Sequence, residues 1–312
     1  MLDQFPAVLR MMLNLRIRIN ILLQAIRLFL SVCLFRVSRL AQRQKNFFEG
    51  LLPEGFARKC VANWIHTSED DYLTILSVLG SECLGALRVS DNIHDSGDYK
   101  PLSIESVKAL AKEGVSKSTE LITEAHLSLT GAFGKVGLYY DPERNMWYQP
   151  QGDAPSTHIV KQSHVRLSDI VTNEQLSLTA ASKLGISIPE SFIINTGAAR
   201  DDEILFATKR YDRVIPKNAA YINGLIRPFR LHQEDFAQAL GIPAYEKYEN
   251  GNKQYLLKAF QLLRNNVADP LTDQLKLWDM LIYDYLNCII GCIRWRMKRK
   301  RYMCLSRIRT LL

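Results

Sequence analysis

The chain has 312 residues, 47% of them hydrophobic, which is enough to bury a substantial core and excludes a disordered protein. Its formal charge of +8 is uneven: residues 1–45 carry +7 and residues 292–312 carry +8, so residues 46–291 together carry −7. An acidic body between two basic ends disfavours a nucleic-acid-binding domain and is typical of a soluble cytosolic protein with foreign termini.

Cysteine and histidine residues give no sign of a disulfide framework or a metal site. No CxxC pair and no regular spacing occurs among the six cysteines, which are Cys33, Cys60, Cys83, Cys288, Cys292 and Cys304. The six histidines are scattered along the chain. We therefore expect reduced thiols and no metal ligands.

Residues 1–45 contain an apolar run from Ile19 to Phe35 that Arg27 interrupts. A central arginine costs about 2.5 to 3.5 kcal/mol on membrane-insertion scales, so we expect no membrane-spanning helix. A basic amphipathic helix on a membrane surface is one alternative. We favour the other, a segment that does not belong to the fold.

Balanced, patterned sequence begins at Asn46. In chain order we expect a helix over 46–55, a helix over 68–80, a strand over 85–89, a linker over 90–101 and a helix over 104–112. Ser68 and Ser103 stand where an N-cap residue is needed, and Gly80 follows the second helix as a stop signal.

A stretch from Ser128 to Lys161 has the composition of a phosphate-binding hairpin. Gly131, Ala132 and Gly134 are small enough for backbone N–H groups to approach an anion, and Lys161 ends an apolar strand pattern. The spacing is not that of a P-loop, because two residues separate the glycines and Val136 follows the lysine. An ordinary β-turn with a surface lysine is the alternative.

The remainder changes from strands to helices. We expect a helix over 173–185, strands over 186–195 and 203–212, and helices over 233–240, 253–267 and 271–290. Strands, one helix and further strands are the order of a kinase amino-terminal lobe. The last helix has a wide apolar face made of Leu275, Trp278, Leu281, Ile282, Tyr285, Leu286 and Ile289.

Seven short motifs occur in a fixed order. They are Phe47–Gly55, Gly80–Ala86, Ser128–Ala132, Thr157–Lys161, Asn173–Glu174, Lys209–Arg213 and Gln233–Phe236 with Gly241–Pro243. Together they resemble the HipA family, the serine/threonine kinase toxins of bacterial toxin–antitoxin modules, over about residues 46–291. The resemblance implies an α+β, HipA-like kinase-type fold with a β-rich nucleotide lobe and an incomplete helical lobe.

The resemblance also implies a division of the chain and a set of partners. We expect a basic segment outside the family at 1–45, an accessory region at 46–101, a nucleotide-binding region at 102–230, a partial helical lobe at 231–291 and a basic tail outside the family at 292–312. ATP with Mg²⁺, a HipB-like DNA-binding antitoxin that connects the toxin to DNA, and a protein substrate such as an aminoacyl-tRNA synthetase are the ligands and partners known in the family.

Roles in ATP binding follow from the resemblance residue by residue. The segment Thr130, Gly131, Ala132, Phe133, Gly134 and Lys135 would cover the phosphates, Lys161 would contact them, and Lys209, Arg210 and Tyr211 would form the hinge that holds adenine. Ser128 matches the autophosphorylation site, where added negative charge repels ATP. Glu174 would pair with Lys161 as in kinases, or else be a solvated first-turn acid.

The residues for catalysis are missing from this sequence. The family carries an aspartate, histidine and asparagine loop after the helix that matches 271–291, but residues 292–312 contain no Asp, Glu, Asn or His. We predict a frameshift after Gly291 and an inactive kinase. Two alternatives stay open, a pseudokinase that binds the antitoxin or ATP, and a nucleic-acid binder that stacks bases on Trp295 and Tyr302.

Overall fold

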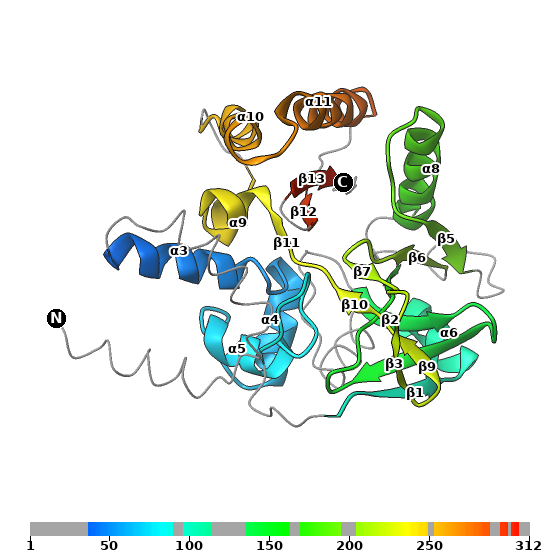
Figure 1. Cartoon of the computed structure of the whole chain (residues 1–312). Coiled ribbons are helices and arrows are strands. Elements are labelled where there is room, and N and C mark those ends of the chain that lie inside the picture. The colour runs from blue at the N-terminus through cyan, green and yellow to red at the C-terminus, as the bar shows by residue number, and fades with distance from the viewer. Residues whose placement is uncertain are drawn as a thin grey trace.

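The computed structural model describes residues 37–89, 96–113, 135–162, 169–194, 204–248, 253–287, 294–298 and 301–305. Figure 1 shows a sheet region at lower right, amino-terminal helices at left, and a separate layer of carboxy-terminal helices at the top of the view. No helix among these residues is both long and apolar enough to cross a lipid bilayer.

Four helices belong to the amino-terminal part: α3 (Val37–Glu49), α4 (Gly55–Trp64), α5 (Tyr72–Leu79) and α6 (Ile104–Glu113). The carboxylate of Asp71 accepts a hydrogen bond from the Thr74 N–H at 3.2 Å, so α5 begins later than the helix expected from Ser68. Ser103 caps α6 as predicted, because its hydroxyl accepts from the Ser106 N–H at 3.1 Å.

Two expectations for this part are wrong. Residues 85–89 form a turn and irregular backbone in place of the expected strand, because Gly85 adopts a left-handed conformation with φ of 78°. Residues 98–102, expected within a linker, form strand β1 against β3. The expected boundary at residue 46 also lies inside α3, and the one at residue 102 lies inside β1.

One six-stranded antiparallel sheet positions the candidate site. In the order of the sheet its strands are β1 (Asp98–Leu102), β3 (Met146–Gln151), β2 (Lys135–Asp141), β4 (His158–Gln162), β6 (Leu205–Lys209) and β5 (Ser191–Ile194). Neighbouring strands are antiparallel throughout. The register pairs Lys135 with Lys161 and Lys161 with Phe206.

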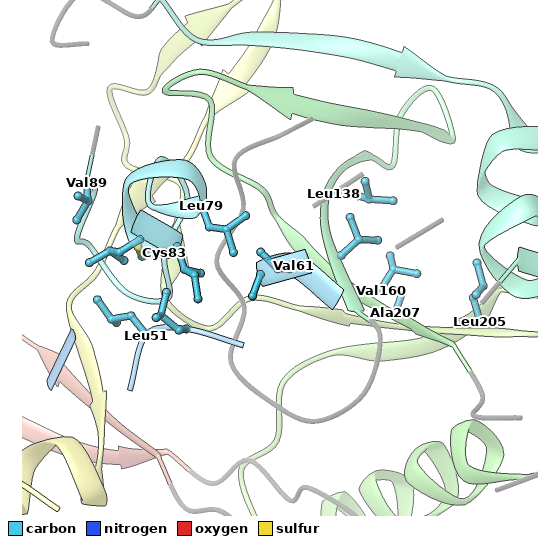
Figure 2. Close-up of a cluster of buried hydrophobic side chains, with 14 of the residues drawn as sticks. Leu51, Val61, Leu79, Cys83, Val89, Leu138, Val160, Leu205 and Ala207 are labelled. Carbon is cyan, nitrogen blue, oxygen red and sulfur yellow. The ribbon is translucent and has the colours of Figure 1, made fainter. Parts of the chain in front are cut away.

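Side chains alternate between the two faces of this sheet. One face carries Val136, Val160 and Ala207, which join the main hydrophobic core. Figure 2 shows Val160 and Ala207 on one side of Val61 and Leu51 with other side chains of the amino-terminal part on its other side, all in the same cluster. The amino-terminal part and the sheet therefore share one core.

The other face carries Phe206 and packs against α8 (Ile170–Lys183). Phe206 is fully buried with Val171, Leu178 and Ala181 of that helix. Figure 1 shows α8 standing beside β5 and β6. This packing places α8 next to the end of β4 where Lys161 lies.

Short strands connect the sheet region to the carboxy-terminal helices. They are β7 (Arg213–Val214), β8 (Ala220–Ile222), β9 (Leu225–Arg227), β10 (Phe229–Arg230) and β11 (Gln233–Asp235), followed by α9 (Phe236–Leu240), the 3₁₀ turn η2 (Ala244–Glu246), α10 (Tyr255–Asn266) and α11 (Pro270–Leu286). The helix expected from Gln233 begins at Phe236, because Asp235 and Gln238 form a capping box.

The basic tail contains two strands, although we expected no regular structure there. Strand β12 (Arg294–Lys298) pairs with β11 and with β13 (Arg301–Leu305). Basic and apolar residues alternate along β12, which is the period of a strand.

A large part of the predicted apolar face of α11 is exposed to solvent. Leu277, Met280 and Tyr283 are buried on the opposite side of the helix. The exposed apolar residues of α11, which we call the α11 outer face, are Leu271, Leu275, Trp278, Ile282, Tyr285 and Leu286, with exposed fractions of 45% to 83%. Such a contiguous apolar surface promotes association.

Candidate functional site

Lys161 lies near the end of β4 and forms an ion pair with Glu174 of α8. Both side chains are largely buried, and the Lys161 ammonium also lies 5.3 Å from the centre of the Phe206 ring. The expected pairing of these two residues is therefore present. Glu174 is not a solvated helix-end acid, because α8 begins at Ile170, earlier than predicted, which places Glu174 on the buried side of the helix.

Lys135 lies opposite Lys161 on the neighbouring strand and is also buried. Directly opposed residues of antiparallel strands point to the same face with Cβ atoms about 5 Å apart. Two lysine side chains on the same face of adjacent strands raise the local positive charge and favour a nearby anion. Glu174 supplies one negative charge, and the arrangement suits a phosphate group as well.

Several residues predicted for the phosphate loop lie outside the described residues. They are Ser128, Thr130, Gly131, Ala132, Phe133 and Gly134. Lys135 is the first described residue after them and begins β2. The loop and the autophosphorylation role of Ser128 stay predictions.

The predicted hinge follows β6. The N–H of Lys209 donates to the Glu190 carbonyl and the N–H of Arg210 donates to the Thr157 carbonyl, both at 2.8 Å. Two backbone donors of the segment are thus already used within the protein. Any hydrogen bonds of this segment to adenine must come from its other backbone groups.

The hinge side chains differ from each other. Lys209 is exposed and its ammonium lies 3.0 Å from a Glu190 carboxylate oxygen. The Arg210 side chain is completely buried and points into a group of charged residues. Its guanidinium therefore has a structural role.

That group of charges, which we call the Glu82 clamp, is made of Glu82, Arg210, Asp212, Arg213 and Arg230. Burial by itself would raise the pKa of Glu82, but Arg213, Arg230 and Arg210 outweigh it and lower the pKa to about 2. The pKa of Asp212 is lowered in the same way, since Arg210 and Arg213 outweigh its burial. Both carboxylates are ionised at neutral pH.

Thr208 contributes a second polar group next to the hinge. It is 1% exposed, and its hydroxyl oxygen has no hydrogen-bond partner in the part of the chain that the structure describes. By strand alternation it lies on the same face of β6 as Phe206. An orphaned hydroxyl two residues from the Lys161–Phe206 pair fits a site that takes a polar ligand.

Metal ligands do not come together in the described ranges. No group of three or more His, Cys, Asp or Glu side chains there is arranged to hold a metal ion.

Comparison with models of protein families identifies the family of this chain. The family model "HipA-like C-terminal domain" matches residues 127–289, more than half of the chain, and "HipA N-terminal domain" matches residues 25–90. The chain belongs to the HipA family. The amino-terminal match of this HipA-family chain begins inside segment 1–45, which we expected to lie outside the family.

Individual relatives agree with this assignment. The chain is 30% identical over 257 residues to the Sinorhizobium fredii protein named "Putative kinase Y4mE", covering 79% of this chain and 57% of the relative. It is 26% identical over 215 residues to "Putative kinase Y4dM" of the same organism, covering 66% of this chain and 47% of the relative. The chain thus spans about half the length of these relatives.

A solved structure shares the fold. It is a chain of the Shewanella oneidensis MR-1 complex of HipA, HipB and operator DNA, with a TM-score of 0.66 and 18% identity, and the match covers 86% of this chain and 64% of that chain. The fold is therefore the HipA kinase fold, as the motifs predicted.

The sequence motifs did not reveal the Glu82 clamp. The motifs Gly80–Ala86 and Lys209–Arg213 were separate signals, but the structure brings them into contact, with Arg210 Nη1 3.1 Å from Glu82 Oε1. The one available signal was that each motif places charges beside segments otherwise rich in small and apolar residues.

Proposed function

We propose that this HipA-family chain binds ATP between β2, β4 and the segment 209–211, and that the 312-residue polypeptide transfers no phosphate. The observation that carries ATP binding is the Lys161–Glu174 ion pair on a sheet beside a helix. Kinases use the same pairing to hold a lysine toward the nucleotide phosphates.

The charged side chains of this site suit the phosphates of ATP better than they suit magnesium. Glu174 holds the Lys161 ammonium in place, and Lys135 adds a second positive charge from the adjacent strand. ATP would supply the phosphoryl group for transfer, but residues 292–312 contain no carboxylate, amide or imidazole side chain that could bind magnesium or act as the base for the accepting hydroxyl. This composition supports the proposal of binding without transfer.

The partners of the family enter this proposal as well. The Shewanella relative was solved with HipB and operator DNA, so we assign this chain a HipB-like antitoxin and, through it, an indirect association with DNA. A protein substrate such as an aminoacyl-tRNA synthetase belongs to a family member that carries the catalytic loop.

Thermal shift with ATP tests the binding site. At ATP concentrations of 100 times Kd a single site stabilises the folded protein by about 2.7 kcal/mol. We expect a clear rise in Tm for the natural chain and for Lys209→Met, whose side chain is exposed, and none for Lys161→Met. An equal rise in all three proteins would contradict the assignment of Lys161.

Phosphate transfer from ATP is tested in a separate assay. With γ-labelled ATP and Mg²⁺ we expect no label on Ser128 or on an added aminoacyl-tRNA synthetase. Clear incorporation would refute the inactivity of this polypeptide and leave ATP binding intact.

A further inference from the structure

A turn of the HipA N-terminal domain is joined to the hinge by buried charges. We propose that Glu82 is a positioning residue for the nucleotide site. Its carboxylate fixes the start of β4 and the segment 210–213. Through this contact the amino-terminal domain sets the affinity of the site for nucleotide. The nucleotide part of this inference rests on the proposed function, and the structural part does not.

Glu82 holds the start of the strand that carries Lys161. Its Oε1 atom accepts hydrogen bonds from the Ser156 N–H at 3.0 Å and from the Ser156 hydroxyl at 2.9 Å. Ser156 is completely buried and lies two residues before β4. The position of Lys161 along the sheet therefore depends on a contact made by the amino-terminal domain.

The same carboxylate holds the segment after β6. Glu82 Oε1 accepts from Arg210 Nη1 at 3.1 Å and from Arg213 Nη2 at 2.7 Å. Arg230 Nη2 lies 2.5 Å from Oε2 as an ion pair, without the geometry of a hydrogen bond. One carboxylate thus connects β4, the hinge and β10.

A second set of contacts runs from Asp212 and Arg213 back to the backbone of Gly85 in the amino-terminal domain. The carboxylate of Asp212 accepts a hydrogen bond from the Gly85 N–H at 2.7 Å, and Arg213 Nη1 donates to the Gly85 carbonyl at 2.9 Å. Gly85 has a φ of +78°, and a Cβ atom there would lie 2.9 Å from the Gln233 nitrogen. Only glycine fits this turn without strain, which fixes the turn against the hinge.

Burial makes the arrangement rigid. The side chains of Glu82, Arg210, Asp212 and Arg213 are each at most 3% exposed. Moving the hinge backbone separates buried opposite charges, and water does not replace the lost partners. These buried contacts therefore connect the hinge to the amino-terminal domain in addition to the pairing of β7 with β10 that follows it.

Hydrogen exchange of backbone amides tests the structural part in the full chain. In the natural protein we expect the amides of Ser156, Arg210 and Arg213 to exchange as slowly as those in the centre of the β2–β3 pair. In Glu82→Gln we expect exchange at these three amides to become at least tenfold faster, with β2–β3 unchanged. The matched control Glu143→Gln, at an exposed turn, should leave all of them unchanged.

The ATP affinity of the same proteins tests the functional part. Faster exchange together with a Kd for ATP at least tenfold weaker in Glu82→Gln supports the inference. Unchanged exchange overturns it, and so does faster exchange with an unchanged Kd. If the natural chain binds no ATP, the proposed function fails, and the exchange data by themselves support or overturn the clamp.

If Glu82→Gln does not fold, a second variant tests the same inference. Ser156→Ala removes one hydroxyl donor to Glu82 and keeps every charge. It should speed exchange at Arg210 and Arg213 about threefold. Rapid exchange of these amides already in the natural protein would overturn the inference without any variant.

Discussion

Replacing Asp284 by asparagine should stabilise the protein at alkaline pH. Asp284 lies near the carboxy-terminal end of α11, is 7% exposed, and its Oδ1 atom has no hydrogen-bond partner among the described residues. Burial raises the pKa of this carboxyl from 3.8 to about 7. At pH 8 the folded chain must therefore hold a poorly solvated negative charge, which asparagine removes.

The sign of the pH dependence follows from the direction of the shift. The folded state retains the proton up to pH about 7, but the unfolded state releases it near pH 3.8. The stability that this group contributes is fully present below pH 3.8 and is lost as the pH rises through 7. Asparagine does not titrate, so the advantage of the variant should grow between pH 4 and 8 and then level off.

The size of the effect has a ceiling set by the shift. A rise of the pKa from 3.8 to about 7 corresponds to about 4 kcal/mol. The neighbouring Tyr285 and Leu286 are exposed, and screening by nearby water reduces the expected gain to about 2 kcal/mol.

Urea unfolding at pH 4, 6 and 8 measures the difference between the variant and the natural chain. Asp279→Asn is the matched control for exchanging a carboxylate for an amide, because Asp279 is exposed on the same helix. A pH-independent difference for Asp284→Asn would refute the conclusion that burial raises the pKa of this carboxyl.

Two further predictions concern packing. Leu275→Glu on the α11 outer face should reduce binding of a hydrophobic dye and slow aggregation, with less than about 0.5 kcal/mol change in unfolding free energy. Leu277→Glu, at a completely buried position of the same helix, should instead prevent folding of the helix pair, and circular dichroism with dye fluorescence distinguishes the two outcomes. Leu138→Ala should destabilise the shared core by about 2 to 5 kcal/mol in urea unfolding, and a loss below about 0.5 kcal/mol would contradict the burial of this residue between the sheet and the amino-terminal helices.

The order of the motifs predicted the fold, because together the motifs resemble those of the HipA family. Helix and strand boundaries were less predictable, since several residues competed to end or begin an element. Ser68 and Asp71 both suit an N-cap, and only the folded chain shows that Asp71 accepts the Thr74 N–H. The strand β1 was missed because proline and glycine nearby favour a linker.

The site was predictable where its residues follow a local pattern. Lys161 ends an apolar strand pattern and Glu174 lies in a predicted helix, and the likeness to kinases suggested their pairing, with a solvated helix-end acid as the alternative. The Glu82 clamp has no such pattern, because Arg210 and Glu82 are 128 residues apart in the chain. Charged residues are usually exposed, so sequence reasoning assigns Glu82 and Asp212 to the surface unless the partners are known.

Because the sheet and the carboxy-terminal helices have separate hydrophobic cores, the proposed binding of nucleotide would not require the transfer of phosphate. The main core joins the amino-terminal helices to β2, β4 and β6 and includes no residue of α10 or α11. Those two helices pack in their own cluster around Ala259, Leu263 and Leu277. Tyr283 connects the helical layer to the site, because its hydroxyl donates to the Ser177 carbonyl of α8 at 2.5 Å and its ring joins the cluster around Phe206. Since α8 carries Glu174, this contact connects the helical layer to Lys161, and the sheet holds the lysine with its own core.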